Sequence, residues 1–358
     1  MEDRIEISTS DAPEWSIETI ASDHFSDNPE VADKLATLWE TYITSGRDKQ
    51  LAGQFDRLLD GAIVSRPNVP GKRFEGRALV IVGESGAGKS HAIRYLFEKR
   101  PSLAQYDSEM GKMMPLVSVI APSPCTLKQL AFEILDAVGY PTNRNIQENV
   151  AWRIVKQQLK LRRCLILHVD EAQHAVHFSN PAEQQKLADT LKNLMQNPEW
   201  PMRLVLSGLP ELTQFRQSDP QLPLRSRIHL VNPLQLPADG KFVRFMTKGI
   251  LETRLGFDIS DLEQDEFYPR LCHAASNFLG RIGRYLQGGA EEIIYAREER
   301  ATREHFGETY FQITGCTPEQ NIFLAPNWHQ IDPLEALSED DEEDEPKGKT
   351  GRKKRSRK

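Results

Sequence analysis

The sequence of 358 residues has no apolar run that approaches the roughly 20 residues a membrane-spanning helix needs. It also lacks a basic start: Met1-Glu2-Asp3-Arg4 is acidic where a secretory signal peptide would be basic. Apolar residues make up 39% of the chain and charged residues 27%, which is enough for one α/β domain with a smaller appendage. We therefore expect a globular cytoplasmic protein that does not enter a membrane.

Cysteine is scarce. The four cysteines lie far apart and form no C-x-x-C pair: Cys125, Cys164, Cys272 and Cys316. The spacing therefore indicates neither a zinc site nor a disulfide framework, and we expect reduced thiols in the core or in loops.

The chain also lacks an excess of basic residues, since its net charge is −7. Residues 1–30 carry nine acids and one base, residues 338–358 carry seven acids and eight bases, and the remainder carries 36 of each. The overall charge of the body cannot steer it to nucleic acid. Any such binding must come from a local patch or from assembly into an oligomer.

What the sequence does contain is a glycine-rich stretch between an apolar run, 78–82, and an amphipathic segment. Residues 83–90 read G-E-S-G-A-G-K-S and fit the pattern G-x-x-x-x-G-K-[ST]. In such a loop the backbone N–H groups surround phosphate oxygens, the lysine neutralises charge, and the serine can ligate Mg²⁺. We predict that ATP and Mg²⁺ bind here through Gly83, Glu84, Ser85, Gly86, Ala87, Gly88, Lys89 and Ser90.

A second motif follows the apolar run 164–169, where Asp170 and Glu171 come 81 residues after Lys89. In P-loop enzymes the aspartate at this strand end holds Mg²⁺, here through water or Ser90, and the glutamate polarises the attacking water. His168 interrupts the apolar run, and we interpret it as a satisfied core or strand-edge histidine.

A third strand end carries Ser207, after the apolar run 202–206. A small polar residue at this point could hold the attacking water, or it could be an ordinary serine between a strand and a turn. Both interpretations remain open from the residues alone.

The order of the segments predicts an α/β fold, with a parallel sheet flanked by helices and followed by a small all-α region. We expect an acidic disordered segment over 1–30 and a helical segment over 31–75 that packs on the nucleotide domain. We expect the α/β nucleotide-binding domain over 76–236, a helical lid over 237–320, and a disordered acidic and basic tail over 321–358.

The motifs together resemble one family. G-E-S-G-A-G-K-S, V-D-E-A-Q, L-S-G-L-P-E-L, L-R-S-R-I and G-R-I-G-R occur in an order similar to that of the TniB/TnsC group of AAA+ ATPases, which regulate DNA transposition. The resemblance covers about residues 65–297. The nucleotide motifs are shared by many AAA+ proteins, whereas S-G-L-P-E-L, the close R-x-R pair and I-G-R are more specific.

The resemblance implies a role for several further residues. Ser207 corresponds to the sensor-1 position, and Arg225 or Arg227 to an arginine finger that reaches the neighbouring subunit's nucleotide. Arg284, or else Arg281, corresponds to the sensor-2 arginine on the lid. An arginine supplied by a neighbour would couple hydrolysis to assembly. The competing interpretation of Arg225 and Arg227 is a solvated turn.

The resemblance also implies partners. Members of this group form ATP-dependent rings or filaments around duplex DNA, which they hold by its backbone with little sequence preference. They recruit a DDE transposase and interact with a TniQ-type target-selection protein. Lys128, Arg144 and Lys156 would be candidate phosphate contacts, although each could equally be an ordinary surface cation.

Two other functions compete with this one. Residues 170–174, D-E-A-Q-H, superficially resemble a helicase motif, but a helicase of that kind needs a second full RecA-like domain, and the region after residue 237 is too short and too helical. The other alternative is an AAA+ switch or scaffold of the secretion or signalling type, which acts on protein partners without DNA.

Overall fold

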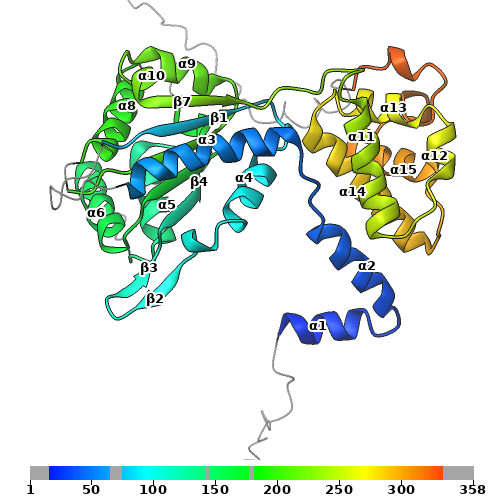
Figure 1. The fold of residues 1–358 in the computed structure, drawn as a ribbon, viewed down its shortest axis with the longest axis horizontal. Coiled ribbons are helices and arrows are strands. Elements are labelled where there is room, and N and C mark those ends of the chain that lie inside the picture. The colour runs from blue at the N-terminus through cyan, green and yellow to red at the C-terminus, as the bar shows by residue number, and fades with distance from the viewer. Residues whose placement is uncertain (1–15, 65–74, 142–144, 177–180, 198, 334–358) are drawn as a thin grey trace, which may run out of the picture. The chain divides into compact units, whose positions relative to one another are not determined.

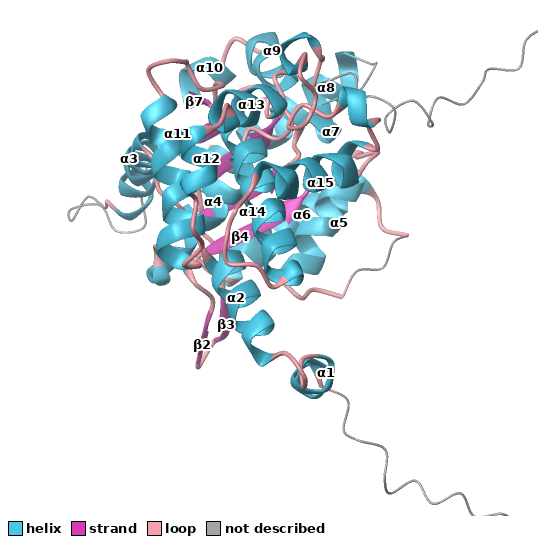
Figure 2. Ribbon diagram, turned by 90° about the vertical axis from the view of Figure 1, so that its right-hand side faces the viewer, coloured by secondary structure: helices cyan, strands magenta, loops and turns pink. Residues whose placement is uncertain are grey.

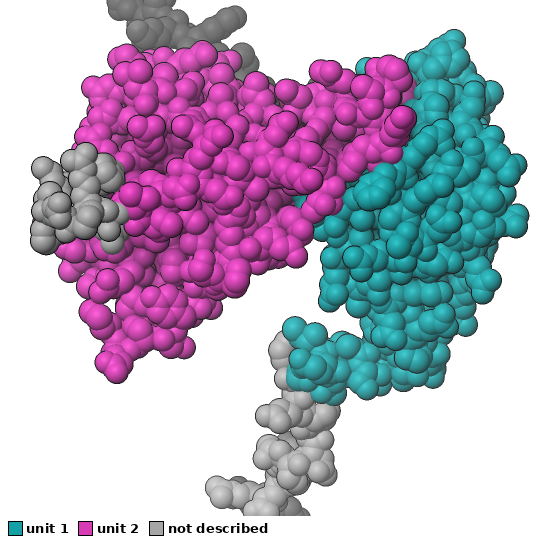
Figure 3. Space-filling model, viewed as in Figure 1, with its two compact units in different colours: residues 1–43, 243–271, 285–358 teal, residues 44–242, 272–284 magenta. Residues whose placement is uncertain are grey.

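The computed structural model describes residues 16–64, 75–141, 145–176, 181–197 and 199–333. The chain forms two compact units, shown in different colours in Figure 3. Unit 1 comprises residues 1–43, 243–271 and 285–358, and unit 2 comprises residues 44–242 and 272–284. Among the described residues, no helix combines the length and the apolar character needed to cross a membrane.

Unit 2 is built on a five-stranded sheet with the order β4-β5-β6-β1-β7 (Figure 1). All four neighbouring pairs are parallel, so the carboxyl ends of the strands share one edge of the sheet. The inner strands are buried along their whole length and mostly apolar, as expected for parallel strands covered on both sides. The strands are β1 (Ala78–Val82), β4 (Leu116–Ile120), β5 (Ile166–Asp170), β6 (Arg203–Gly208) and β7 (Ser226–Leu230).

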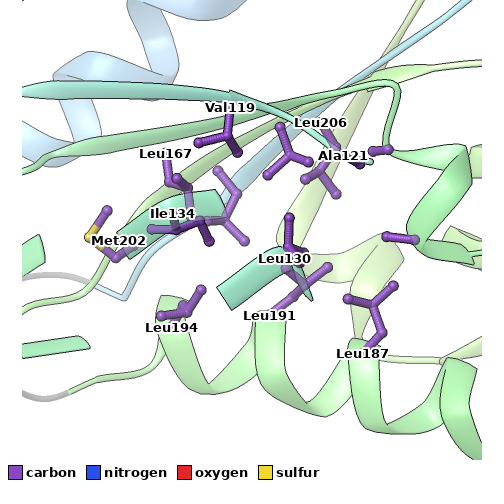
Figure 4. Close-up of a cluster of buried hydrophobic side chains, with 14 of the residues drawn as sticks. Val119, Ala121, Leu130, Ile134, Leu167, Leu187, Leu191, Leu194, Met202 and Leu206 are labelled. Atoms are coloured by element: carbon purple, nitrogen blue, oxygen red, sulfur yellow. The ribbon is translucent and has the colours of Figure 1, made fainter. Parts of the chain in front are cut away.

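Helices cover both faces of this sheet. Alternate residues of a strand point to opposite faces, so each strand contributes side chains to both layers. In β1, Ala78, Val80 and Val82 pack into one cluster, part of which Figure 4 shows, and Leu79 and Ile81 pack into another. The first cluster draws on α5 (Leu127–Ala137), α6 (Glu148–Leu161), α8 (Pro181–Met195) and α9 (Glu211–Ser218), and the second on α3 (Gly46–Ile63) and α4 (Lys89–Glu98). The predicted parallel sheet flanked by helices is confirmed.

Unit 2 also contains elements that the sequence did not predict. The strands β2 (Tyr106–Ser108) and β3 (Gly111–Met113) form a small antiparallel hairpin, which Figures 1 and 2 show projecting from the sheet. Strand β7 was also not predicted. It pairs with β1 and is the last strand at one side of the sheet. Two single-turn helices, α7 (Gln173–Val176) and α10 (Leu222–Arg225), follow β5 and precede β7.

Unit 1 is helical, as predicted for the C-terminal region, and its core is aromatic. The rings of Phe267 and Phe306 meet edge to face with their centroids 4.6 Å apart, and Phe323, Tyr285 and Tyr310 pack around them. Among the described residues, the α- and π-helices that lie wholly or partly in this unit are α1 (Ile17–His24), α2 (Pro29–Glu40), α11 (Gly240–Thr247), a π-helix (Lys248–Arg254), α12 (Ser260–Gln264), α13 (Phe267–Ala274), α14 (Leu279–Ala296) and α15 (Arg303–Thr314).

The N-terminal boundaries need two corrections. Residues 31–75 do not all belong with the nucleotide domain: α3 packs on β1, β6 and α4, whereas α2 belongs to unit 1 and packs on its π-helix. The α2 residues Leu35 and Leu38 are buried there, and Trp39 Nε1 donates to Glu291 Oε1 at 2.7 Å. The expected disordered segment 1–30 also contains helix α1, which Ser16 caps by accepting from the Thr19 N–H.

The C-terminal boundaries need two corrections as well. The expected lid, 237–320, gives residues 272–284 to unit 2. The expected tail, 321–358, begins inside the unit 1 core, because Ile322, Phe323 and Ala325 are buried. The Arg270 guanidinium fixes this segment by donating from Nη1 to the carbonyl oxygens of all three residues. Residues 334–358, with the charged runs, lie outside the described residues.

Candidate functional site

The loop between β1 and α4 has a backbone that depends on glycine. Gly86 and Gly88 have φ angles of 75° and 94°, in the left-handed region that residues with a side chain rarely adopt. At Gly83, a Cβ atom would lie 2.9 Å from the Val231 carbonyl oxygen. Helix α4 begins directly after Gly88, so its first N–H groups, which have no partner within the helix, can bind an anion at this loop.

Lys89 lies within this loop, with only 6% of its surface exposed. Its Nζ donates to the carbonyl oxygens of Gly83 at 2.7 Å and Glu84 at 3.0 Å. Burial lowers the pKa of Lys89, while the nearby carboxylates of Glu171 and Asp170 act in the opposite direction. The loop thus encloses a cation that phosphate oxygens could approach.

Asp170, at the end of β5, joins the loop to the neighbouring strand. Its Oδ2 accepts from the Ser90 hydroxyl at 2.8 Å, and its Oδ1 accepts from the Ser207 hydroxyl at 2.5 Å. Burial acts to raise the pKa of Asp170, but the hydrogen bonds from Ser207 and Ser90 outweigh it, so the pKa lies below its usual value. The structure therefore brings Lys89, Ser90, Asp170 and Ser207 to one edge of the sheet.

Glu171 follows in a left-handed conformation, with a φ angle of 50°. Its carboxylate accepts from the Gln173 side-chain amide, and the amide oxygen of Gln173 accepts from the Leu209 N–H at 3.2 Å. Gln173 is 2% exposed, so this amide connects the ends of β5 and β6 from inside the protein. The unusual φ angle and the amide together set the direction in which the Glu171 carboxylate points.

His168 is a satisfied histidine of the sheet, as interpreted from the sequence. Its Nε2 lies 2.8 Å from Ser207 Oγ, and its Nδ1 lies 2.8 Å from Ser118 Oγ. Burial lowers the pKa of His168 to about 4, against the opposing effect of Asp170, so the ring is neutral near pH 7.

The oxygen atoms at this edge fit Mg²⁺ bound together with a nucleotide. Among the described residues, no three His, Cys, Asp or Glu side chains come together in a way that could hold a metal. Ser90 and Asp170 instead offer a hydroxyl and a carboxylate 2.8 Å apart. Mg²⁺ prefers such hard oxygen ligands and is commonly held by one or two protein groups plus the phosphates of its substrate.

The first turn of α14 lies against the glycine-rich loop of residues 83–90, the P-loop, within unit 2. A Cβ atom on Gly280 would lie 2.5 Å from both the Gly86 carbonyl oxygen and the Gly88 nitrogen, and a Cβ atom on Gly86 would meet the Arg281 side chain at 2.6 Å. Of the two predicted sensor-2 candidates, Arg281 is therefore the one that these contacts bring to the loop. Arg284, which we ranked first from the sequence, is exposed one turn further along the helix.

The two candidate finger arginines lie near the amino ends of the strands, opposite the carboxyl ends that carry the P-loop. Ser226 pairs with Ala78 and Arg227 with Leu79, at the start of β1 rather than at its P-loop end. Arg227 is exposed, and Arg225 forms an ion pair with Glu75 at 3.5 Å. The five residues of β1, at a rise of about 3.3 Å each, therefore separate both arginines from the P-loop of their own chain.

The segment that carries these arginines is firmly anchored. Asp219 accepts from Lys192 Nζ at 2.6 Å and from the Gln221 N–H at 2.8 Å, just before α10. The Lys192 ammonium holds the pKa of Asp219 at about 2. Arg216 donates from Nε to Ser226 Oγ at 2.8 Å at the start of β7. These bonds fix the direction of α10 and β7.

The three candidate DNA contacts are not part of this cluster. Lys128 lies in α5, with its Nζ 5.5 Å from the centre of the Phe132 ring, and Lys156 lies in α6, which packs on α5. Both side chains are partly exposed. Arg144 lies outside the described residues.

Three contributors to the site were not found from the sequence: Ser118, Gln173 as a partner of Glu171, and Gly280. Ser118 and Gly280 act through contacts between segments that are far apart in the chain. Ser118 and His168, for example, are separated by 50 residues in the sequence. A polar residue within each of two apolar strands was the one signal available for Ser118 and His168.

In a comparison with protein families, residues 72–215 match the family described as an AAA domain. A comparison with curated proteins finds no match. Among solved structures, the Orc1 protein of Aeropyrum pernix in complex with DNA is similar, with 19% identity and a TM-score of 0.52 over 80% of this chain and 70% of that one. Cdc6p of Pyrobaculum aerophilum has 12% identity and a TM-score of 0.56 over 80% and 75%.

A third similar structure contains nucleotides. It is the ORC2 protein of Aeropyrum pernix in ADPNP and ADP complexes, with 14% identity and a TM-score of 0.50 over 78% of this chain and 74% of that one. At these identities the likeness establishes the fold alone. The predicted AAA+ P-loop fold is confirmed, and the narrower resemblance to the TniB/TnsC group stays a prediction.

Proposed function

We propose that this chain, which carries an AAA domain, is a cytoplasmic ATPase that assembles on duplex DNA and regulates DNA transposition. The observation that carries the proposal is the meeting of Lys89, Ser90, Asp170 and Ser207 at the carboxyl ends of β1, β5 and β6. The order of the motifs supports the narrower part of the proposal. The S-G-L-P-E-L, R-x-R and I-G-R motifs are its more specific elements.

The site contains the groups that ATP hydrolysis needs. The P-loop N–H groups and Lys89 bind the phosphates, while Ser90 and Asp170 hold Mg²⁺. Mg²⁺, when bound, supplies positive charge that stabilises the phosphate oxygens. Glu171 orients the attacking water and accepts its proton at the carboxylate, and Arg281 contributes a cation from α14.

The position of Arg225 and Arg227 supports assembly into a ring or filament. Because they lie at the opposite edge of the sheet from their own P-loop, their charge can serve hydrolysis only at the P-loop of a neighbouring copy. A contact that joins one edge of the sheet to the opposite edge of the next copy is head-to-tail and generates rings or helical filaments. Hydrolysis is then coupled to assembly.

Duplex DNA is the proposed partner of that assembly. The Orc1 protein with the similar fold was solved in complex with DNA. Lys128, Lys156 and Arg144 are the proposed phosphate contacts, each repeated in every subunit, so that a few charges per chain sum to useful affinity. The proposal also includes recruitment of a DDE transposase and communication with a TniQ-type target-selection protein.

One observation favours a second candidate function, a nucleotide-dependent scaffold for protein partners. Between residues 31 and 337 the chain carries 36 acids and 36 bases, so the body has no net positive charge for DNA. The helicase alternative has no such support, because the described residues form one large parallel sheet rather than two RecA-like domains.

The test measures ATP hydrolysis and duplex DNA binding for the unmutated protein, K89A and E171Q. Of the three proteins, we expect only the unmutated one to hydrolyse ATP. With ATP, negative-stain microscopy should show it as oligomers bound to DNA. We expect E171Q to retain these oligomers and K89A to form none. DNA affinity should fall steeply with salt, in proportion to the number of phosphates neutralised.

Each part of the proposal can fail separately. Absence of hydrolysis in the unmutated protein would contradict the ATPase. Hydrolysis without ATP-dependent DNA binding would favour the protein-partner scaffold. K89A is matched by K99A, a lysine at the end of the same helix whose ammonium lies over the Tyr95 ring, outside the loop. This control should behave like the unmutated protein.

A further inference from the structure

Three polar side chains form a hydrogen-bonded row across three neighbouring strands, from the edge strand β4 to β6. Ser118 of β4, His168 of β5 and Ser207 of β6 occupy three neighbouring strands, and both bonds of the imidazole measure 2.8 Å. The Ser207 hydroxyl then continues the row to Asp170 at 2.5 Å, and Ser90 closes it on the other carboxylate oxygen. The row thus ends at the two residues proposed to hold Mg²⁺.

The direction of each bond follows from the number of hydrogens available. The Ser207 hydroxyl has one hydrogen, which it donates to the Asp170 carboxylate, so it can only accept from His168 Nε2. The neutral imidazole therefore carries its hydrogen on Nε2, and its Nδ1 accepts from the Ser118 hydroxyl. Every donor in the row points toward the next residue, and the last acceptor is the Asp170 carboxylate.

Packing alone does not explain a histidine at this position. His168 is 3% exposed, and the Phe97 ring meets it edge to face with the centroids 5.3 Å apart. The neighbouring strand residues Leu167 and Val169 are apolar and buried. Burial of a polar ring costs free energy unless its nitrogens are paired, so an apolar side chain would serve the core more simply. The specific result of the imidazole is the fixed orientation of Ser207.

We propose that His168 is a positioning residue of the nucleotide site. It donates to Ser207 and thereby holds the hydroxyl of that residue toward Asp170. Without this donor, the Ser207 hydroxyl can rotate and the Asp170 carboxylate loses one of the bonds that set its direction relative to Ser90. The inference rests on the proposed ATPase function and adds to it a residue that contacts neither nucleotide nor metal.

The experiment compares H168L with H168Q in the full-length protein. Leucine fills the apolar space without a donor, whereas glutamine can offer an amide N–H close to the position of Nε2. For each variant we would measure kcat and KM for ATP, the melting temperature, and the affinity for ATP without Mg²⁺. We expect H168L to lower kcat by about 10-fold to 100-fold, as for other groups that orient a metal ligand. The metal-free affinity should stay unchanged, and H168Q should recover most of kcat.

A double variant separates orientation from general disturbance. If His168 acts through Ser207, then H168L should lower kcat much less in an S207A background than alone. Nitrogen-15 spectra of the unmutated protein, with the His168 signals assigned by their loss in H168Q, should show the neutral tautomer with hydrogen on Nε2.

Three results would overturn the inference. The first is a folded H168L with unchanged kcat, the second is full additivity of H168L and S207A, and the third is a His168 with hydrogen on Nδ1. An unmutated protein without ATPase activity would instead contradict the proposed function, and this inference with it. If H168L is too unstable to assay, H168Q and the tautomer still decide the outcome.

Discussion

Gly280 is a residue at which a single added Cβ atom would change the site. It lies in the first turn of α14, and the contact it makes with Gly86 and Gly88 is backbone to backbone. The same turn carries Arg281, whose side chain lies over Gly86. The absence of a Cβ atom at Gly280 therefore sets how closely the arginine approaches the P-loop.

We predict that G280A weakens ATP binding. The added methyl group would lie 2.5 Å from Gly86 O and Gly88 N, which are backbone atoms that cannot turn aside. Overpacking of this kind costs about 1–3 kcal/mol, which the protein would relieve by moving α14 away from the loop. Equilibrium binding of a non-hydrolysable ATP analogue measures the loss, and an unchanged dissociation constant would contradict the prediction.

Gly53 provides a matched control for this substitution. It lies inside α3, and a Cβ atom there would meet nothing within 4 Å. In a helix interior, alanine is more favourable than glycine by about 1 kcal/mol. G53A should therefore melt at the same or a higher temperature and bind the analogue normally.

At the scale of elements, the corrected ends of the chain show how packing overrides a local pattern. Residues 321–333 have no helical periodicity, and the sequence therefore suggested a disordered tail. The structure buries Ile322 and Phe323 in the aromatic core and pairs their carbonyl oxygens with Arg270. A short segment without regular structure can thus be part of a core when one guanidinium satisfies its backbone.

We predict that the position of a C-terminal truncation decides the stability of unit 1. A chain that ends at residue 333 keeps this segment, whereas a chain that ends at residue 320 removes Phe323 and leaves the buried Arg270 without its three carbonyl partners. Loss of a buried phenylalanine alone costs about 3–5 kcal/mol. Chemical denaturation should show normal stability for the first truncation and a large loss for the second. Equal stability of the two would contradict this assignment.

At the scale of the whole molecule, the carboxyl ends and the amino ends of the sheet strands carry different groups of the proposed site. The P-loop edge holds Lys89, Asp170 and Glu171, and the opposite edge holds Arg225 and Arg227. One chain cannot bring the two edges together. The proposed activity therefore belongs to an assembly rather than to a single copy.

We predict that two inactive variants restore ATPase activity when they are mixed. E171Q keeps its arginines but lacks the base, whereas R225A/R227A keeps an intact site but lacks the arginines. In a mixed assembly an E171Q neighbour supplies arginines to the intact site, so steady-state hydrolysis should exceed that of either protein alone. The triple variant E171Q/R225A/R227A is the matched control, and it should restore nothing. A fully active R225A/R227A would contradict the role of these arginines.

Much of the fold and the outline of the site could be predicted because they depend on local signals. The apolar runs predicted four of the five parallel strands, and the P-loop pattern itself requires a strand before it and a helix after it. Strand β7 was missed because Arg227 and His229 interrupt its apolar pattern at the edge of the sheet. Edge strands need less apolar surface than central ones, so their sequences carry a weaker signal.

The sequence by itself therefore determined the chemistry of the strand ends, since the spacing of glycine, lysine, serine and carboxylate can be recognised without knowledge of the fold. Only the tertiary structure decided which residues lie beside them: Ser118 next to His168, Gly280 against Gly86, and Arg281 rather than Arg284 at the loop. The reason is physical. These contacts join segments that are far apart in the chain, and sheet order and helix packing, rather than local periodicity, bring them together.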